Sequence, residues 1–596
     1  MIGFRFSKKE RFLYPGQELR PHTRGRRKAP DVMVDEPTRL ALEVGRTRMM
    51  VAASLFAMVY MAIGIRLFDL MVLKSTDRRP PVSQSATVPL DTKRAEIVDR
   101  NGLVLATNLP TVNLYADSTK ILNAEEATTK LLALMPDLNR EEVLSKLMSG
   151  RRFIYLERNL SPRLQAAINA QGIPGIYFED SERRIYPHGH MVSHVLGATD
   201  PDNGGIAGIE RSFDQRLKDD QQPLRLSLDL RVQAVVRDTL LAAITDFQAV
   251  GGVGLVMDAN NGQVIALVSL PDYDPAEFGN SPADSQFNRA TLGVYEMGST
   301  FKLLNTAMAL DSGQIRVADM FDTSRPLKIS RFTISDDHPI PRPQNVAEIL
   351  VHSSNIGSAR MAMALGSEHQ REFLGRMGML SPPPIELPEI SPPLIPAQWR
   401  EIAMMTISYG HGIAVTSVNL ATAVSALVNG GRLYKPTLLL DTPQDPKQVI
   451  APQTSMLMRY LMRLVVSEGT GKKADVPGYL IGGKTGSAEK VSQHGGYDTH
   501  NLRTTFAAAF PLDDPRYVVL TVLDEPKGLK STYGFATAGW NAAPTTGKII
   551  SQIAPLLGVF PRLDAMQPYA PLNNVDLKNI TQSIAFITGG ARAPAR

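Results

Sequence analysis

Gly298-Ser299-Thr300-Phe301-Lys302 is the stretch of this 596-residue chain from which its architecture and chemistry can be worked out. The residues after Ser299 (TFKLLNTAMALDSG) predict a helix that ends at Gly313. Ser299 and Lys302 therefore lie one turn apart on the same helix face. A serine hydroxyl becomes nucleophilic when a base takes its proton, and a partly buried lysine can have a pKa low enough to be that base. Because S-x-x-K is short, an ordinary surface lysine at position 302 is the alternative.

Two further motifs follow in the chain. In Ser353-Ser354-Asn355, a hydroxyl and an amide two residues apart can point the same way from a tight loop. Ser353 can then relay a proton from Lys302 to a leaving group, and Asn355 can hydrogen-bond a substrate amide. Lys484-Thr485-Gly486-Ser487 combines a glycine that admits a substrate backbone with a cation and hydroxyls that suit a carboxylate. Taken alone, the first is equally an ordinary polar loop and the second an ordinary strand end.

The segments around these motifs predict the fold class. Gly254–Asp258 and Gln263–Val268 alternate as strands around Asn261-Gly262, a dipeptide that suits a hairpin turn. Later, Tyr517–Leu523 predicts a buried strand and Thr545–Leu556 a helix. Strands at both ends with helices between them indicate an α+β domain. Its antiparallel sheet is flanked by helices and takes its edge strands from the start and the finish of the domain.

Upstream of this domain, residues 74–225 predict a linker and a smaller mixed α/β unit without a nucleotide-binding glycine loop. Its strand-like and helical stretches are, in order, Ala95–Val98, Val112–Tyr115, Ala124–Leu134, Arg140–Met148 and Pro162–Ala170.

The N-terminal region predicts a membrane anchor. Twelve Lys and Arg residues crowd the first 48 positions, and residues 49–65 then carry no charge. Seventeen uncharged residues reach the short end of the roughly 17–25 needed to span a bilayer. The basic flank fits the positive-inside rule, so we expect residues 1–48 in the cytoplasm, a single-pass anchor at 49–73 and the rest outside. A buried core helix and a cleaved signal peptide are the alternatives.

The composition limits the chemistry. The chain has no cysteine, which excludes disulfides, thiolate catalysis and cysteine-ligated metal sites. A net charge of +5 is modest and gives no reason to expect nucleic-acid binding. His190 and His194 have helical i, i+4 spacing, but no H-E-x-x-H pattern completes a familiar metal site. We therefore expect neither a metal nor a cofactor, and we expect these histidines and His188 to serve packing and the surface.

Together, S-x-x-K, S-x-N and K-T-G in this order resemble the acyl-enzyme motifs of β-lactamases and penicillin-binding proteins. The chain resembles class B penicillin-binding proteins from the anchor to about residue 560. Further blocks that match this family are Arg94–Gly102 (with alanine at 95 where glycine is usual), Arg184–Pro187, Gly208–Glu210, Leu226–Asp229, Tyr409–Gly412, Asn429–Gly431 and Glu468–Gly471.

The resemblance implies a D,D-transpeptidase that cross-links peptidoglycan and binds β-lactams covalently. It implies Ser299 as nucleophile, Lys302 as base, and Ser353 and Asn355 in proton transfer and substrate holding. Lys484, Thr485, Gly486 and Ser487 would bind the substrate carboxylate, and the backbone N–H groups of Ser299 and Ser487 would form the oxyanion hole.

The branch of the family follows from two further stretches. Asp524–Gly528 with Ala536–Pro544, and Thr504–Pro511, resemble the division-specific FtsI type. The resemblance then implies a catalytic domain outside the inner membrane at the septum, beside an FtsW-like glycan polymerase and other division proteins. It gives a pedestal domain within residues 74–225, a transpeptidase domain at 226–565 and a tail at 566–596.

Three alternatives share these motifs: an elongation-type transpeptidase, a free β-lactamase, and a sensor or scaffold that acylates without turnover. Against a β-lactamase stand the predicted anchor, the pedestal and the length of the chain. Glu386 and Glu389 lie in the proline-rich loop Pro382–Pro396, and neither is a convincing deacylating glutamate.

Overall fold

The computed structural model describes residues 48–51, 53–61, 94–329, 332–491 and 496–562. The predicted linker (74–93) and C-terminal tail (566–596) lie outside the described residues, as do most of the basic tail and half of the anchor. The described parts of the anchor, 49–51 and 53–61, are helical. Within the described ranges, no helix has both the length and the apolar character needed to cross a bilayer. The chain divides at about residue 90 into two units, and the second unit contains a larger and a smaller domain.

The larger domain is built on a five-stranded antiparallel sheet. In sheet order its strands are β18 (Gly482–Val491), β19 (Tyr497–Phe510), β20 (Tyr517–Asp524), β8 (Gly251–Asp258) and β9 (Val264–Leu270). β8 and β9 form the predicted hairpin, and β9 is an edge strand as expected. The other edge is β18 rather than the last strand of the domain. β20 is buried on both faces and pairs with β19 and β8, so it lies inside the sheet.

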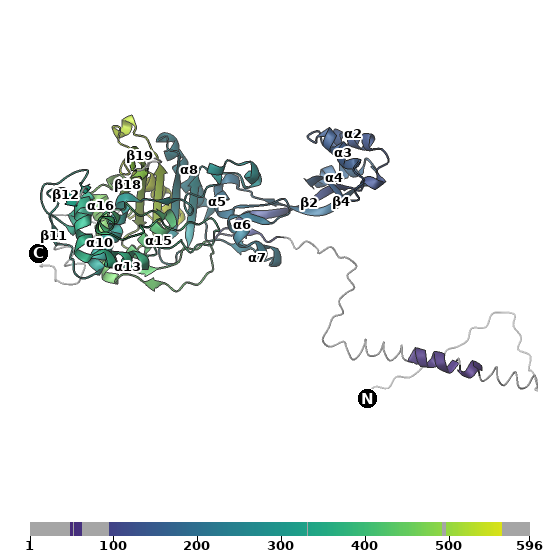
Figure 1. Cartoon of the computed structure of the whole chain (residues 1–596), viewed down its shortest axis with the longest axis horizontal. Helices are drawn as coiled ribbons and strands as arrows, with labels where there is room; N and C mark the ends of the chain where they lie inside the picture. The colour runs from purple at the N-terminus through teal and green to yellow at the C-terminus, as the bar shows by residue number, and fades with distance from the viewer. Residues whose placement is uncertain (1–47, 52, 62–93, 330–331, 492–495, 563–596) are drawn as a thin grey trace, which may run out of the picture. The chain divides into compact units, whose positions relative to one another are not determined.

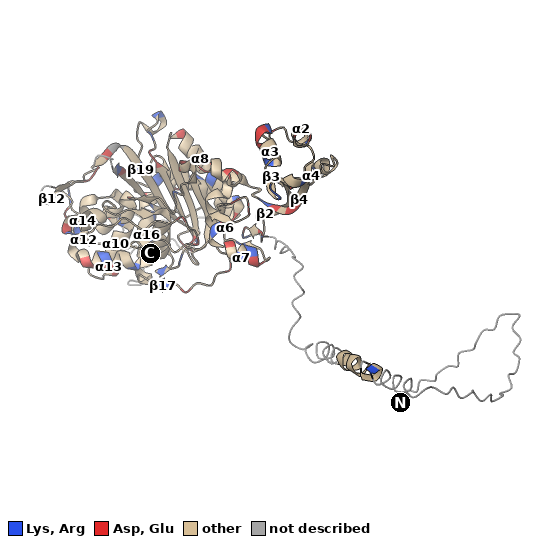
Figure 2. Ribbon diagram, turned by 45° about the vertical axis from the view of Figure 1, so that its right-hand side comes forward, with Lys and Arg blue, Asp and Glu red and all other residues tan. Residues whose placement is uncertain are grey.

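Helices cover both faces of this sheet. Successive side chains of a strand point to opposite sides, and β20 has apolar side chains on both sides. Val518 and Leu520 of β20 belong to one apolar core and Val519 to another. The first core includes side chains of α10 (Phe301–Asp311), α15 (Ser417–Val428) and α16 (Pro452–Ser467), and the second those of α8 (Leu230–Asp246) and α17 (Ala542–Leu556). Charged residues lie mostly on outer helices and loops, while the central strands are largely uncharged (Figure 2).

Two short helices place the second motif. α11 (Val346–His352) starts at a capping box in which Asn345 and Glu348 satisfy each other's backbone amides. It ends at Ser353, whose φ of 62° is left-handed. Ser354 then caps α12 (Asn355–Leu365) by accepting the Gly357 amide at 2.9 Å. Ser353-Ser354-Asn355 is therefore a tight turn between two helices, which fixes the direction of both outer side chains.

The smaller domain has its own sheet and core. Its strands are β1 (Ile97–Val98), β2 (Val104–Ala116), β3 (Ile154–Leu160), β4 (Ile176–Ile185) and β7 (Leu224–Arg225). Its main helices are α2 (Ala124–Leu134), α3 (Arg140–Leu147) and α4 (Pro162–Asn169), which match the predicted helices to within one residue (Figure 1). A separate apolar core lies between these helices and β2 and β3.

A buried ion network joins three sequence blocks of this domain. Glu210, with a fully buried side chain, pairs with Arg94 at 2.6 Å and with Arg184 at 2.7 Å. Arg94 also contacts Asp214 at 2.7 Å. Removing one member of a buried pair leaves an uncompensated charge, so the network holds the start, the middle and the end of the domain in one arrangement.

Candidate active site

Ser299 lies in a single 3-10 turn (Gly298–Thr300) that leads into α10. Two glycines make this turn fit against its surroundings. Gly298 has a φ of +54°, and a Cβ there would lie 2.8 Å from the Ser487 carbonyl oxygen. Gly410 has a φ of +87°, and a Cβ there would lie 2.0 Å from the Gly298 carbonyl oxygen. Both glycines have a left-handed backbone and no side chain, so β18 and the 409–412 loop can contact the serine turn directly.

Lys302 is 1% exposed, and its Nζ donates to the Ser299 hydroxyl at 2.9 Å. Burial lowers the pKa of Lys302 to about 7, although the carboxylates of Asp336 and Asp337 act in the opposite direction. A neutral amine at this distance can take the serine proton. Lys302 is therefore buried, and it is not the ordinary surface lysine that the S-x-x-K motif alone also allowed.

Ser353 stands between two buried lysines. Its hydroxyl accepts from Lys302 Nζ at 3.0 Å and from Lys484 Nζ at 3.0 Å. Lys484 is fully buried, and burial, together with the charge of Lys302, lowers its pKa well below the ordinary value. The three motifs, far apart in sequence, thus meet through direct hydrogen bonds around one hydroxyl.

Asn355 faces the same lysine. Its Oδ1 accepts from Lys302 Nζ at 2.7 Å, and its Nδ2 donates to the Ser335 carbonyl at 3.0 Å. In the structure the amide therefore orients Lys302.

Asp336 is a site residue that the sequence analysis missed. Its carboxylate accepts from the amides of Asn355 (2.6 Å) and Ile356 (3.0 Å) and from the Ser354 hydroxyl (2.7 Å). The negative charge at the start of α12 is favourable, and it holds the Ser353-Ser354-Asn355 turn in place. No sequence signal points to it, because an aspartate in a polar loop is ordinary.

The third motif is on edge strand β18, alongside the serine turn. A Cβ at Gly486 would lie 2.3 Å from the Met297 carbonyl oxygen, so only glycine fits there. Thr485 Oγ1 lies 2.6 Å from Thr470 Oγ1, and Ser487 Oγ accepts from the Ala538 amide at 3.0 Å. The Ser487 hydroxyl retains its own proton to donate to an anion.

These residues line a cleft with a volume of about 340 Å³. Its lining includes Ser299, Ser353, Thr485 and Ser487 together with Asp336, Asp337, His338, His352, Thr470, Lys472, Lys473 and Trp540. Lys473 Nζ lies 4.0 Å from the centre of the Trp540 ring. The cleft thus brings Ser299 together with both cationic and anionic residues in its lining.

The loop glutamates and the histidines have other surroundings. Glu386 accepts from Thr437 Oγ1 at 2.5 Å and from the Leu438 amide at 2.8 Å, whereas Glu389 accepts from the Gly208 amide at 3.1 Å. Neither contact is with the serine turn. His194 is buried, and burial lowers its pKa to about 4.

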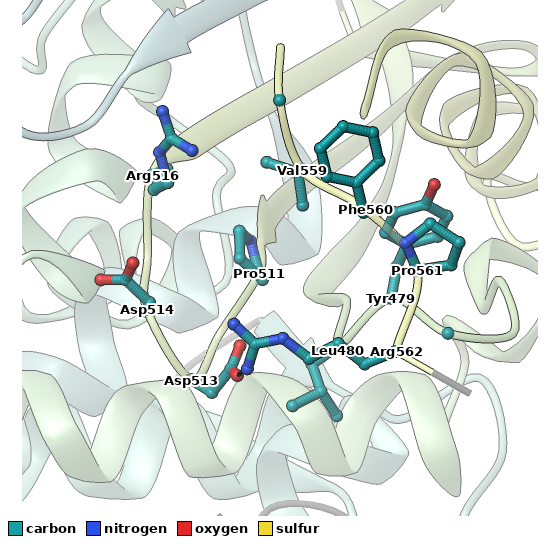
Figure 3. A pocket seen from close by; sticks show the side chains of 12 residues that line it. Tyr479, Leu480, Pro511, Asp513, Asp514, Arg516, Val559, Phe560, Pro561 and Arg562 are labelled. Carbon is teal, nitrogen blue, oxygen red and sulfur yellow. Dashed lines mark hydrogen bonds and ion pairs between the residues drawn. The ribbon is translucent and has the colours of Figure 1, made fainter. Parts of the chain in front are cut away.

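A second cavity, of about 260 Å³, lies between the segment before β18, the β19–β20 turn and the segment after α17 (Figure 3). Asp513 in its wall has a 2% exposed side chain and pairs with Arg562. None of the predicted catalytic or substrate-binding residues lines this cavity.

Comparisons with known proteins show the family and the fold of the chain. Residues 252–549 match the model of the penicillin binding protein transpeptidase domain, and residues 89–222 match that of the penicillin-binding protein dimerisation domain. The chain is 38% identical to the probable peptidoglycan D,D-transpeptidase FtsI of Caulobacter vibrioides, over 78% of this chain and 82% of that protein. It is 29% identical to the peptidoglycan D,D-transpeptidase FtsI of Escherichia coli, over 82% of this chain and 87% of that protein. Penicillin-binding protein 3 of Mycobacterium tuberculosis, solved with aztreonam, has a similar fold, with a TM-score of 0.64 and 22% identity over 79% of this chain and 98% of that one.

Proposed function

The chain belongs to the penicillin-binding protein transpeptidase family, class B of the FtsI type, and from this premise we propose how its residues carry out the reaction. It is a peptidoglycan D,D-transpeptidase that works through an acyl-serine and is open to acylation by β-lactams. The observation that carries the residue assignment is the 2.9 Å contact between Lys302 Nζ and Ser299 Oγ.

In the first half-reaction, Ser299 Oγ attacks the carbonyl carbon of the D-Ala–D-Ala bond and gives its proton to neutral Lys302. The backbone N–H groups of Ser299 and Ser487 hold the oxyanion. Loss of one such donor typically costs about 10²–10³ in rate. Collapse of the intermediate breaks the peptide bond, and the departing D-alanine amine receives a proton through Ser353, which lies between the two lysines. An acyl-enzyme remains.

In the second half-reaction, an amine of a neighbouring stem peptide attacks the ester carbonyl. Its proton returns through Lys302, the cross-link forms as a new amide, and Ser299 is regenerated. Asn355 keeps Lys302 in position through both steps. Lys484, Thr485 and Ser487, with Gly486 leaving room on the strand, receive the terminal carboxylate of the donor.

Mass spectrometry of the intact protein after benzylpenicillin treatment tests the assignment. We expect one penicilloyl adduct on the wild type and none on Ser299→Ala. An adduct that persists on Ser299→Ala would place the nucleophile elsewhere. Slow loss of the adduct is expected of a transpeptidase, whereas rapid turnover of nitrocefin would indicate a β-lactamase.

We further propose the topology and the partners. Residues 1–48 form the cytoplasmic tail, 49–73 the single anchor, 74–225 the linker and pedestal, 226–565 the transpeptidase domain and 566–596 a tail. The uncharged stretch and its basic flank support this arrangement. The enzyme then works outside the inner membrane at the septum, with an FtsW-like polymerase and other division proteins. Protease added to spheroplasts should digest the large domain, and depletion should give filaments, whereas round cells would indicate an elongation role.

A further inference from the structure

The cleft around Ser299 extends beyond the residues proposed to act on the donor. Its lining includes Lys472, Lys473 and Trp540, none of which belongs to the three catalytic motifs. Both lysines are exposed and lie in a single 3-10 turn that ends at Ala474. Ala474 is fully buried, and a Cβ at Gly547 of α17 would lie 3.0 Å from its carbonyl oxygen. The two ammonium groups therefore belong to a turn that is closely packed on the rest of the domain.

One of these lysines lies over an aromatic stack. Lys473 Nζ is 4.0 Å from the centre of the Trp540 ring. The Phe535 ring stacks on Trp540, with centroids 5.7 Å apart and 11° between the ring planes. A cation over an aromatic face is attracted by the ring but keeps its charge and its hydrogen-bond donors. The stack thus holds an ammonium at the cleft and leaves it able to bind an anion.

No carboxylate of the described chain neutralises this pair of lysines. Across the residues that the structure describes, neither Lys472 nor Lys473 forms an ion pair. The two carboxylates in the same lining, Asp336 and Asp337, act on the charge of Lys302. Two adjacent ammonium groups in the lining of a cleft attract an anionic group of a substrate.

The place of the lysines relative to the donor carboxylate indicates which substrate meets them. Thr485, which we propose binds the terminal carboxylate of the donor, has its Oγ1 2.6 Å from Thr470 Oγ1. Thr470 precedes Lys472 by two residues, and both line the cleft. The lysines therefore lie on the side of the cleft at which the donor ends. Because the donor has a single D-alanine beyond the scissile bond, it leaves the cleft unfilled past its terminal carboxylate.

The attacking amine of the second half-reaction arrives on this same side. By microscopic reversibility, it takes the position that the departing D-alanine amine has left. The acyl group on Ser299 still occupies the other side of the ester. The rest of the acceptor strand therefore extends from Ser299 past Thr485 toward the two lysines.

We propose that Lys472 and Lys473, beside Trp540, bind a carboxylate of the acceptor strand, an inference that rests on the proposed function. A stem peptide ends in a carboxylate, so an acceptor carries its amine and an anion in one molecule. Contact between this anion and the lysines holds the amine near the acyl-serine ester, which accelerates a step between two molecules. Water carries no such anion, so the subsite favours transfer to a strand over hydrolysis.

The partition of one acyl-enzyme between transfer and hydrolysis tests this proposal on the full chain. The donor is a peptide thioester that acylates Ser299. The acceptors are Nα-acetyl-Lys-D-Ala and the same dipeptide with a C-terminal carboxamide. Mass spectrometry gives the ratio of transferred to hydrolysed product, which does not depend on the rate of acylation. In the wild type we expect this ratio to be about fivefold higher with the carboxylate, the upper range for one exposed ion pair. The difference should shrink as salt is added, because exposed charges are screened.

Three variants assign the preference to the lysines. Lys472→Gln/Lys473→Gln removes both charges and should lower the ratio for the carboxylate acceptor to that for the carboxamide. Lys472→Arg/Lys473→Arg keeps both charges and should keep the preference. Lys530→Gln is the matched control, because Lys530 is an exposed lysine of the loop that carries Trp540 but does not line the cleft. Equal ratios for the two acceptors in the wild type, or an unchanged preference in the double glutamine variant, would overturn the proposal.

The remaining outcomes separate the subsite from the function on which it rests. Slower acylation of the double glutamine variant by the donor, with an unchanged ratio, would assign the lysines to the donor carboxylate and exclude acceptor binding there. Hydrolysis as the only reaction with both acceptors would refute the transfer step that the subsite serves. Absence of any penicillin adduct on Ser299 would instead contradict the proposed function itself.

Discussion

The pH dependence of Ser299 acylation tests the central physical claim, that burial turns Lys302 into a base. With the pKa of Lys302 at about 7, roughly one tenth of the lysine is neutral at about pH 6 and roughly nine tenths at about pH 8. The neutral form accepts the serine proton. The acylation rate should therefore rise with pH, by about tenfold per unit below pH ~6, and level off above pH ~8.

Asp336→Asn perturbs the same group through its charge. Among the charges that raise the pKa of Lys302, that of Asp336 acts most strongly and that of Asp337 less. Removal of either charge stabilises the neutral amine, so the acid limb of the profile should move to lower pH. The shift should be larger in Asp336→Asn than in the control Asp337→Asn. Asp336→Asn should also cost about 1–3 kcal/mol of stability, because the carboxylate accepts three hydrogen bonds.

Stopped-flow acylation with a fluorescent penicillin, from about pH 5 to about pH 9, covers both sides of the Lys302 pKa of about 7. Urea unfolding of each variant measures its stability. A rate that is constant between about pH 5 and about pH 8, or an acid limb that stays in place in Asp336→Asn, would refute the argument. A rate that still rises about tenfold per unit at about pH 9 would show that Lys302 keeps its ordinary pKa when it reacts.

Three further predictions concern stability and catalysis. Glu210→Ala should lower the free energy of unfolding by about 3–5 kcal/mol in a urea titration, because it leaves two buried arginines without their partner. Gly410→Ala should slow penicillin acylation by more than about tenfold, because the new Cβ would lie 2.0 Å from the Gly298 carbonyl oxygen. Gly430→Ala, at a similar φ of +89° but with nothing within 4 Å, is its control and should cost only about 1–2 kcal/mol. Ser353→Ala should slow acylation about a hundredfold or more, because it removes the hydroxyl between the two lysines, and an unchanged rate would exclude Ser353 from proton transfer.

Much of the fold could be read from local patterns. The β8–β9 hairpin follows from two strand-like stretches on either side of Asn261-Gly262, and α2 follows from the helical pattern of Ala124–Leu134. The order of strands in the large sheet could not be read in this way. A fully buried strand such as β20 has the same composition at an edge and in the middle, and only its pairing with β8 settles its place.

Asp336 shows the same limit for the site. It is an ordinary acidic residue in the sequence, and its importance depends on the backbone amides that come to surround it. In the structure the Asn355 side chain contacts Lys302 and Ser335. Its role as a ligand of the substrate amide stays a prediction.

The sequence by itself predicted the reacting groups and the spacing between Ser299 and Lys302. Helical periodicity alone brings these two residues to the same face, one turn apart. The tertiary structure decided whether that pair can react. Lys302 loses its contact with water only when the domain has folded around α10, and the Ser353 hydroxyl reaches both lysines only after α10, the 353–355 turn and β18 have come together. The pKa of a side chain depends on all the groups that surround it, and many of these groups come from distant parts of the sequence.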